Sequence, residues 1–340
     1  MLKSTKNAAY IIAEIGQNHQ GELGLAEKYI KDFASIGADA IKFQKRDMDS
    51  LFSEEKLNSS YESDAAFAGT YGAHRKLLEF DIDQMRYLKE VCNKVGVDFM
   101  CTAFDEVSLS ELLSIDCDLI KLASFDMGNI RLIEKAIQSG KKVILSSGGS
   151  RLEIIDLTYK YFRNVDNIFT LLHCVSQYPC PASNLNLEKM KTYTERFPNC
   201  QIGLSDHFSG PLSGPVGFCA GAEVFEKHVT FNRAWKGTDH SFALSQSGFR
   251  QFVKDINRAA AMQAKKVDDS VLGNEPVFNK LGKTLVADAD ISVGELFSTR
   301  NLTGRILNEP SGISVREMVN LLGKSAKKNY TKGDPIIEKI

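Results

Sequence analysis

Two histidines, each directly after a short apolar run, are the residues whose position most indicates chemistry. The run IGL ends in the polar cluster SDH at His207, and the run VF ends in EKH at His228. A buried strand that ends in titratable residues brings them to one end of a sheet. On neighbouring strands the two imidazoles would lie side by side, where neutral rings bind divalent cations. The alternative is that backbone groups satisfy both histidines within the core.

The same arrangement recurs through the first two thirds of the chain. Carboxyl, amine, amide or hydroxyl groups end the successive apolar runs: Glu14, Lys42, Gln44, Thr102, Lys121, Ser124, Ser146, Ser176 and Ser205. Lysine and hydroxyl groups are donors that hold phosphates and carboxylates. A single lysine of this kind is ordinarily a salt-bridged or surface residue. The whole set, however, predicts an enzyme site for an anionic substrate.

Strand-then-helix units are needed to position these groups. Apolar runs predict strands at 10–15, 40–44, 97–102, 118–124, 142–147, 167–174, 202–204 and 224–225, with amphipathic helices between them. Eight such α/β units in about 250 residues fit a closed (β/α)8 TIM barrel, whose strand ends share one mouth. An open doubly wound sheet is disfavoured because no GxGxxG follows the first strand.

The pattern of predicted strands and helices changes after the barrel units. We expect a catalytic barrel at 1–265, a polar linker at 266–280 and a small separate domain of short strands and glycine turns at 281–340. Residues 45–80 are a polar insertion after the second strand. It is too long for an ordinary connection and is therefore expected to be functional.

Bulk composition excludes several classes of partner. A formal net charge of −1 gives no electrostatic reason to expect nucleic acid. No apolar run approaches the roughly 18 residues of a membrane span, and Glu14 interrupts the N-terminal apolar stretch, so neither a membrane partner nor a signal peptide is expected. The seven cysteines are scattered without a CxxC pair, which favours reduced thiols in a cytoplasmic protein.

Nine motifs carry a resemblance to a known family. In order they are IIAEIGQNHQG, DAIKFQK, TYGAHRKLLEF, LIKLAS, VILSSGG, LLHCVSQYP, IGLSDH, EKHVT and WKGTDHS. Together they resemble the sialic acid synthases, and the tail from KLGKTLVA to NLLGKSA is similar to that family's antifreeze-like (SAF, β-clip) domain. The resemblance covers nearly the whole chain. TYGAHRKLLEF and WKGTDHS are most similar to the animal-type branch, which forms a 9-phosphate.

The resemblance implies a transferase that condenses phosphoenolpyruvate with an open-chain N-acylmannosamine or its 6-phosphate. The products would be phosphate and N-acetylneuraminate or its 9-phosphate, with KDN 9-phosphate, legionaminate and pseudaminate as alternatives. It also implies a divalent metal, Mn²⁺ before Mg²⁺ or Co²⁺, held by His207 and His228 and polarising the sugar aldehyde. A domain-swapped homodimer is implied, in which the small domain covers the partner's barrel mouth.

The same resemblance assigns roles to single residues. Glu14 is expected as general base or proton shuttle, with Asp126 at the second acidic position. The groups expected to hold phosphoenolpyruvate are Lys42, Thr102, Lys121, Ser124, Ser146, Ser176 and Ser205. Those expected to contact the sugar are Gln44, Tyr178 and Asp239, although Asp239 is alternatively a turn cap.

Other positions are assigned with alternatives. His74 and Arg75 are expected to shape the acceptor pocket, and Arg75 to meet a 6-phosphate. Arg305 is the candidate for reaching the partner's sugar site, or else a solvated surface arginine. The strand end LASFD departs from the family's frequent GSGD, since Ala123 and Phe125 replace glycines and alter packing beside the phosphoenolpyruvate groups.

Three other functions remain open. A Schiff-base aldolase would use Lys121 or Lys42 as its nucleophile. A 3-deoxy-heptulosonate-type synthase would perform the same phosphoenolpyruvate chemistry on a sugar phosphate. An inactive barrel with a carbohydrate- or ice-binding lid domain would have no need of both histidines and both lysines at strand ends.

Overall fold

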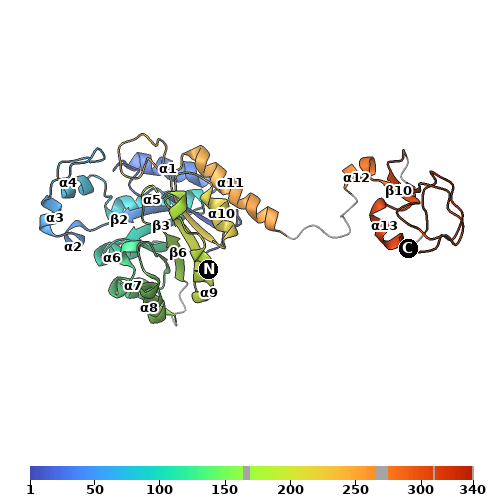
Figure 1. The fold of residues 1–340 in the computed structure, drawn as a ribbon. Helices are drawn as coiled ribbons and strands as arrows, with labels where there is room; N and C mark the ends of the chain where they lie inside the picture. The colour runs from blue at the N-terminus through green and yellow to red at the C-terminus, as the bar shows by residue number, and fades with distance from the viewer. Residues whose placement is uncertain (164–168, 265–274, 309–310, 339–340) are drawn as a thin grey trace. The chain divides into compact units, whose positions relative to one another are not determined.

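The apolar runs of the first unit form eight parallel strands, which close into a barrel in chain order (Figure 1). The computed structural model describes residues 1–163, 169–264, 275–308 and 311–338. It comprises two units, Met1–Ala264 and Lys265–Ile340. The barrel strands are β1 (Tyr10–Glu14), β2 (Ala40–Lys45), β3 (Asp98–Ala103), β4 (Leu119–Leu122), β5 (Lys142–Ser146), β6 (Phe169–Cys174), β7 (Gln201–Asp206) and β8 (Val224–His228). The predicted TIM barrel is confirmed.

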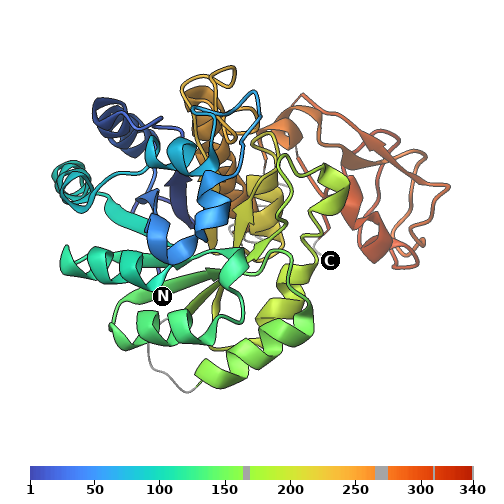
Figure 2. The same ribbon diagram turned by 90° about the vertical axis from the view of Figure 1, so that its left-hand side faces the viewer.

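Helices follow the strands and surround the barrel (Figure 2). They are α1 (Leu23–Ile36), α5 (Ile82–Val95), α6 (Glu106–Ser114), α7 (Ile130–Gln138), α8 (Leu152–Phe162), α9 (Lys189–Arg196), α10 (Ser213–Cys219) and α11 (Gln246–Gln263), with 3-10 turns η1 (Ser124–Asp126) and η2 (Ala182–Asn184). The predicted capping box starts α5: Asp81 and Gln84 exchange side chain to backbone hydrogen bonds.

Among the helices that follow the barrel strands, α10 was not predicted. The small-residue run after β7 forms α10, although its glycines have low helix propensity. A Cβ on Gly214 would lie 2.7 Å from the Phe252 ring, and one on Gly217 would lie 3.0 Å from the Phe225 ring. The glycines therefore allow α10 to approach α11 and β8 closely, and this packing outweighs propensity.

The barrel interior changes from apolar to polar along the strands. Its lower layer is one buried cluster made of Leu2, Tyr10, Ile12, Ala40, Met100, Leu119, Ile144, Leu172 and Val224. Strand side chains alternate between faces, so the residue two positions further along also points inward. Those residues are Glu14, Lys42, Thr102, Lys121, Ser146, Cys174 and Glu226, and all line one cavity. An apolar floor thus supports a titratable layer.

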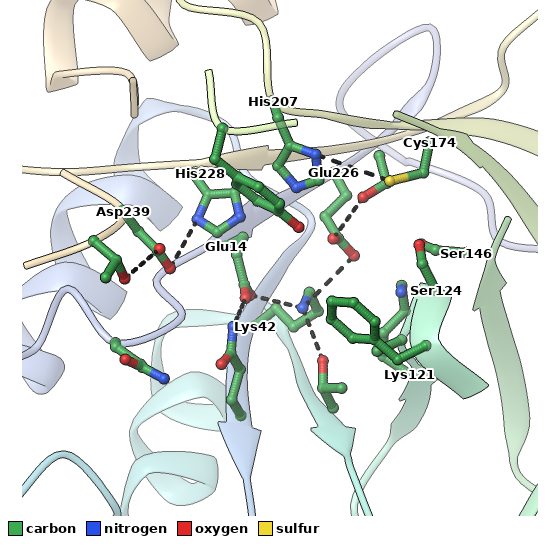
Figure 3. Close-up of a pocket in the computed structure, with 18 of the residues that line it drawn as sticks. Glu14, Lys42, Lys121, Ser124, Ser146, Cys174, His207, Glu226, His228 and Asp239 are labelled. Carbon is green, nitrogen blue, oxygen red and sulfur yellow. Dashed lines mark hydrogen bonds and ion pairs between the residues drawn. The ribbon is translucent and has the colours of Figure 1, made fainter. Parts of the chain in front are cut away.

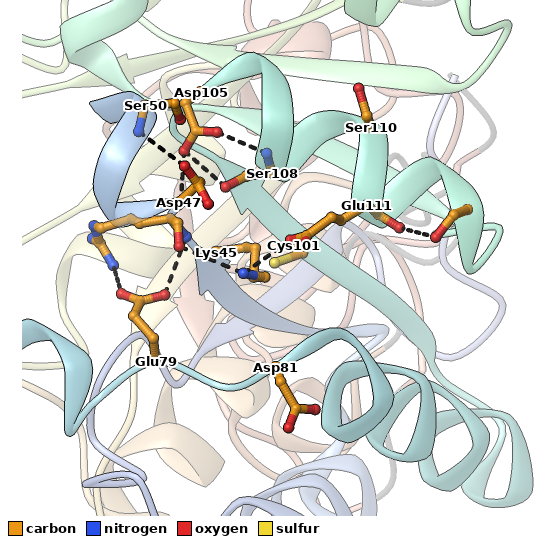
Figure 4. Close-up of polar contacts among 12 residues, drawn as sticks. Lys45, Asp47, Ser50, Glu79, Asp81, Cys101, Asp105, Ser108, Ser110 and Glu111 are labelled. Carbon is orange, nitrogen blue, oxygen red and sulfur yellow. Dashed lines mark hydrogen bonds and ion pairs between the residues drawn. The ribbon is translucent and has the colours of Figure 1, made fainter. Parts of the chain in front are cut away.

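The insertion after β2 folds into three short helices, α2 (Met48–Leu51), α3 (Glu54–Asn58) and α4 (Tyr71–Lys76), which project together from the barrel (Figure 1). Its two ends are tied to each other and to the barrel. Glu79 accepts hydrogen bonds from the backbone N–H of Arg46 at 3.1 Å and from its guanidinium at 2.9 Å. The backbone N–H of Asp47 donates to Asp105, which also caps α6 (Figure 4).

The second unit has its own small core. β9 (Thr284–Ala287) pairs antiparallel with β10 (Leu302–Arg305), and the short helices are α12 (Pro276–Leu281), η4 (Val315–Glu317) and α13 (Met318–Leu321). Apolar residues such as Leu285, Phe297 and Ile336 are buried between them. Residues 266–274 of the predicted linker 266–280 lie outside the described residues. From Pro276 onward the linker is part of α12, because proline is well suited to the first turn of a helix. Among the described helices, none has the length and apolar character to cross a membrane.

Candidate active site

A cavity of about 330 Å³ opens where the carboxyl ends of the barrel strands meet (Figure 3). The structure brings together thirteen of the residues singled out above, and all of them line this cavity: Glu14, Lys42, Gln44, Arg75, Thr102, Lys121, Ser124, Ser146, Tyr178, Ser205, His207, His228 and Asp239. Ala123 and Phe125 of the LASFD strand end line it as well, with the Phe125 side chain 79% exposed at the mouth.

A buried lysine between two carboxylates forms the centre of the site. Lys42 Nζ lies 2.9 Å from Glu14 Oε2 and 3.7 Å from Glu226 Oε2. It also donates a hydrogen bond to Thr102 Oγ1 at 2.9 Å. Burial alone would lower the pKa of Lys42, but the charges of the two carboxylates raise it. Lys42 is therefore a permanent cation at the cavity floor.

The two carboxyl groups differ in protonation. Burial and the nearby charge of Glu226 raise the pKa of Glu14 to about 7, against the opposing effects of Lys42 and Gln44. Burial also tends to raise the pKa of Glu226, but the charges of Lys42 and Lys121 outweigh it and lower that pKa. Ser205 donates to Glu226 at 3.0 Å, which supports the ionised form. Glu226 is thus an anion, whereas Glu14 can exchange a proton near neutral pH.

The two histidines lie side by side, with ring centroids 5.4 Å apart. His207 Nδ1 lies 3.0 Å from the carbonyl oxygen of Val175. When Nδ1–H donates to this carbonyl, Nε2 keeps its lone pair. Burial, with the charges of His207 and Lys42, lowers the pKa of His228 well below its ordinary value, so His228 is neutral.

His228 Nδ1 is buried and has no hydrogen-bond partner in the described part of the chain, and Asp239 Oδ2 lies 3.7 Å from it. An unpartnered neutral imidazole of this kind fits a metal ligand. In the described part of the chain, no three or more His, Cys, Asp or Glu side chains are grouped to hold a metal ion. The imidazoles of His207 and His228 are two neighbouring nitrogen donors whose chemistry is suited to a divalent cation, and a cation held by them would take further ligands from substrate or water oxygens.

A lysine and two serines line the opposite wall of the cavity. Lys121 Nζ donates to the carbonyl of Leu122 at 2.9 Å, and within the described residues no carboxylate lies at ion-pair distance from it. Burial is the main reason that the pKa of Lys121 is lowered. Ser146 Oγ is buried without a partner, and Ser124 Oγ accepts from the Gly148 N–H at 3.0 Å. A buried cation beside unused hydroxyl groups is suited to binding an anion.

Two predicted residues near this wall do not line the cavity. Asp126 is buried in η1, where it accepts a hydrogen bond from Asn129 at 2.9 Å, because the 3-10 turn directs it toward the start of α7. Burial raises its pKa. Ser176 comes two residues after the end of β6 and lines a neighbouring cavity with Ser147 and Lys189.

Two further predicted residues lie elsewhere. His74 is buried inside the insertion, where Nδ1 accepts from the Phe67 N–H at 3.1 Å and the ring centroid lies 4.6 Å from that of Tyr61. Its place is structural because aromatic rings surround it. Arg305 lies on β10 in the second unit, 54% exposed and 3.9 Å from Asp288 Oδ1.

Several cavity residues received no role from the sequence: Gln17, Arg46, Cys174, Glu226 and Thr238. The signal for Glu226 was its spacing of two from His228, which places both side chains on one face of β8. Lys227, between them, points to the other face and forms a buried ion pair with Asp206 at 2.5 Å. The same alternation directs Cys174 inward, with Sγ 3.9 Å from His207 Nδ1, while His173 faces outward and contacts the carbonyl of Leu185.

Comparisons with known proteins agree on one family. The model of the NeuB family matches residues 29–268. N-acetylneuraminate-9-phosphate synthase of Homo sapiens is 32% identical over 339 residues, covering 98% of this chain and 93% of that protein. N,N'-diacetyllegionaminic acid synthase of Campylobacter jejuni is 32% identical over 336 residues, covering 96% and 98%. The crystal structure of the N-acetylneuraminic acid (sialic acid) synthetase of Leptospira borgpetersenii, in complex with citrate, has 32% identity and a TM-score of 0.70, covering 81% of this chain and 93% of that one.

Proposed function

Because this chain belongs to the NeuB family, the family of the sialic acid synthases, we propose that its barrel condenses phosphoenolpyruvate with an open-chain N-acylmannosamine or its 6-phosphate. The product is N-acetylneuraminate or its 9-phosphate, and the second product is inorganic phosphate. Relatives that make legionaminic and pseudaminic acids place the protein among nonulosonate synthases in general. A diacetamido sugar is accordingly the alternative acceptor.

The observation that carries this proposal is the division of the cavity into two walls. Lys121, with Ser124 and Ser146, offers cationic and hydroxyl donors that lack an anionic partner within the described residues. The imidazoles of His207 and His228 offer nitrogen ligands, and His228 is held in its neutral form. One wall suits the phosphate and carboxylate of phosphoenolpyruvate. The other suits a divalent cation, Mn²⁺ before Mg²⁺ or Co²⁺, which when bound would supply Lewis-acid polarisation of the sugar aldehyde.

The protein's own groups then perform two tasks, positioning of phosphoenolpyruvate and transfer of a proton. Lys42, Thr102, Lys121 and the serines hold phosphoenolpyruvate so that its C3 faces the aldehyde carbon, and a bond forms between these two carbons. Water adds at C2, and phosphate leaves by cleavage of the C2–O bond. Glu14 accepts or returns a proton during these steps, because its pKa near neutrality suits both directions.

Two further features belong to the proposal. We expect the second unit to act as an antifreeze-like domain that covers the partner's barrel mouth in a homodimer, with Arg305 reaching the sugar. We also expect the enzyme to work in the cytoplasm, and its seven free cysteines are consistent with a reducing compartment.

The test is release of phosphate from phosphoenolpyruvate with Mn²⁺ and a panel of acceptors: N-acetylmannosamine, its 6-phosphate, mannose 6-phosphate and a diacetamido sugar. We expect chelator-sensitive release with at least one of them. Absence of release with all four would contradict the proposal.

A second experiment separates the aldolase. Borohydride with pyruvate traps an imine on Lys121 or Lys42 in a Schiff-base enzyme, and we expect no such adduct here. The lowered pKa of Lys121 makes this a necessary control, since a neutral amine is the nucleophilic form.

A further inference from the structure

The cations around the cavity differ in whether a carboxylate neutralises them. Four of them line it: Lys42, Arg46, Arg75 and Lys121. Lys42 is paired with Glu14 and Glu226, and Arg46 is paired with Glu79 at 2.9 Å. Within the described residues, no carboxylate lies at ion-pair distance from Lys121 or Arg75. Two of the four cations, on two different elements, thus lack a direct ion pair in the described part of the chain, although the charge of Glu226 acts on Lys121 from a greater distance.

The guanidinium of Arg75 is held in place by neutral groups. Arg75 is four residues after Tyr71 on α4, a spacing that brings their side chains together. Its Nε donates to the Tyr71 hydroxyl at 2.9 Å, and its Cζ lies 5.1 Å from the centre of the Tyr71 ring. Nη1 is buried and has no hydrogen-bond partner among the residues that the structure describes. A buried, oriented donor without an acceptor is costly unless a ligand satisfies it.

The surroundings of Arg75 strengthen the positive charge. The Glu79 carboxylate, close to α4 in the chain, is occupied by the backbone and side chain of Arg46 (Figure 4). Burial lowers the pKa of His74, and the charges of Arg75 and Lys236 lower it further, so this histidine is neutral. Two cations therefore act at one edge of the insertion. An anion at Arg75 would thus meet an attractive field, with no carboxylate of the described residues at ion-pair distance from the guanidinium.

The proposed reaction already uses one of the two free cations. Phosphoenolpyruvate carries its negative charges to Lys121 and the hydroxyl wall, and the acceptor aldehyde faces the histidines. We infer that Arg75 binds a phosphate monoester at the far end of the acceptor, and that the preferred acceptor is therefore a 6-phosphorylated N-acylmannosamine. This inference rests on the proposed function and adds the residue that determines acceptor specificity.

The experiment compares Arg75→Gln with the wild type on N-acetylmannosamine 6-phosphate and on N-acetylmannosamine. We expect kcat/KM for the phosphorylated acceptor to fall roughly 10- to 100-fold, as for loss of a charge-assisted hydrogen bond, and kcat/KM for the unphosphorylated one to fall by a much smaller factor. The KM for phosphoenolpyruvate should also stay unchanged. Arg75→Lys should recover part of the loss, because the charge remains while the planar fork is lost.

The matched control is Lys76→Gln, which removes the same charge from the next residue of α4, an exposed side chain outside the cavity lining. It should leave both acceptors unaffected. An equal loss for both acceptors in Arg75→Gln would assign Arg75 a structural role, and a raised KM for phosphoenolpyruvate would place it in the other substrate's site. Either result, or no change at all, overturns the inference.

A binding measurement separates this inference from the proposed function. Calorimetric titration of N-acetylmannosamine 6-phosphate into protein saturated with phosphoenolpyruvate analogue should show weaker binding to Arg75→Gln than to the wild type. If the wild type releases no phosphate with either acceptor, the proposed reaction fails, while this titration still decides whether Arg75 binds the phosphate group.

Discussion

Glu14 and Lys42 are direct partners on neighbouring strands β1 and β2, and their charged groups approach to 2.9 Å at the cavity floor. Lys42 stabilises the ionised form of Glu14, whereas burial and Glu226 favour the protonated form. The balance leaves a buried carboxyl group that titrates near neutral pH.

The pH dependence of activity should follow this carboxyl group. As a base Glu14 must be ionised, so kcat/KM should rise with pH through about 7 and level off above it. Glu14→Gln should lower kcat roughly 100-fold or more and remove the acidic limb. The 2.7 Å hydrogen bond from Gln44 to Glu14 Oε1 lowers the pKa of Glu14. Gln44→Leu removes this bond and should raise that pKa, so the acidic limb should move to higher pH. A limb that persists in Glu14→Gln would assign it to another group.

Metal binding should depend on both imidazoles. We expect His207→Ala and His228→Ala each to abolish chelator-sensitive turnover and to weaken Mn²⁺ binding in calorimetric titration, because only one nitrogen ligand remains. His173→Gln is the control, since His173 is equally buried but faces outward to Leu185. Undiminished Mn²⁺ binding in either alanine variant would move the metal site elsewhere.

The barrel interior should not tolerate a methyl group at Gly203. A Cβ there would lie 2.3 Å from the carbonyl oxygen of Val224 and 2.6 Å from Cδ2 of Leu172. We expect Gly203→Ala to lower the free energy of unfolding by about 1–3 kcal/mol, measured in urea. Gly24→Ala on α1 is the control: no atom lies within 4 Å of the added Cβ, so the helix should gain up to about 1 kcal/mol. Equal effects of the two substitutions would contradict the close approach at Gly203.

Exchange of the second unit between subunits can be tested by complementation. His207→Ala inactivates its own barrel, and Arg305→Ala should raise the acceptor KM of the partner's barrel. Co-expression of the two variants should form a heterodimer in which an intact barrel receives an intact Arg305, so activity should exceed that of either variant. Co-expression of His207→Ala with His228→Ala is the control, because both changes affect barrels. Absence of recovery in the first pair, with dimers formed, would exclude the swapped arrangement.

Local patterns were sufficient to predict the barrel and most of the site. Apolar runs spaced by amphipathic segments correspond to β1–β8, and the Asp81 and Gln84 signal marks the start of α5. Strand ends converge in any parallel barrel, so residues such as Lys42, Lys121 and His228 could be placed at one mouth without coordinates. The helix α10 could not, because its glycines matter through their contact with Phe252 and Phe225, which are distant in the chain.

The order of residues within the strands thus determined which strand side chains reach the mouth, since side chains alternate between the two faces of a strand. Tertiary structure decided how the groups pair and where loop residues turn. It placed Glu226 against Lys42 and directed Asp126 into a 3-10 turn. It paired Arg46 with Glu79 and left Arg75 with no carboxylate of the described residues at ion-pair distance. These relationships join segments whose mutual distance depends on closure of the barrel and on the folding of the insertion, and charge pairing follows distance in space.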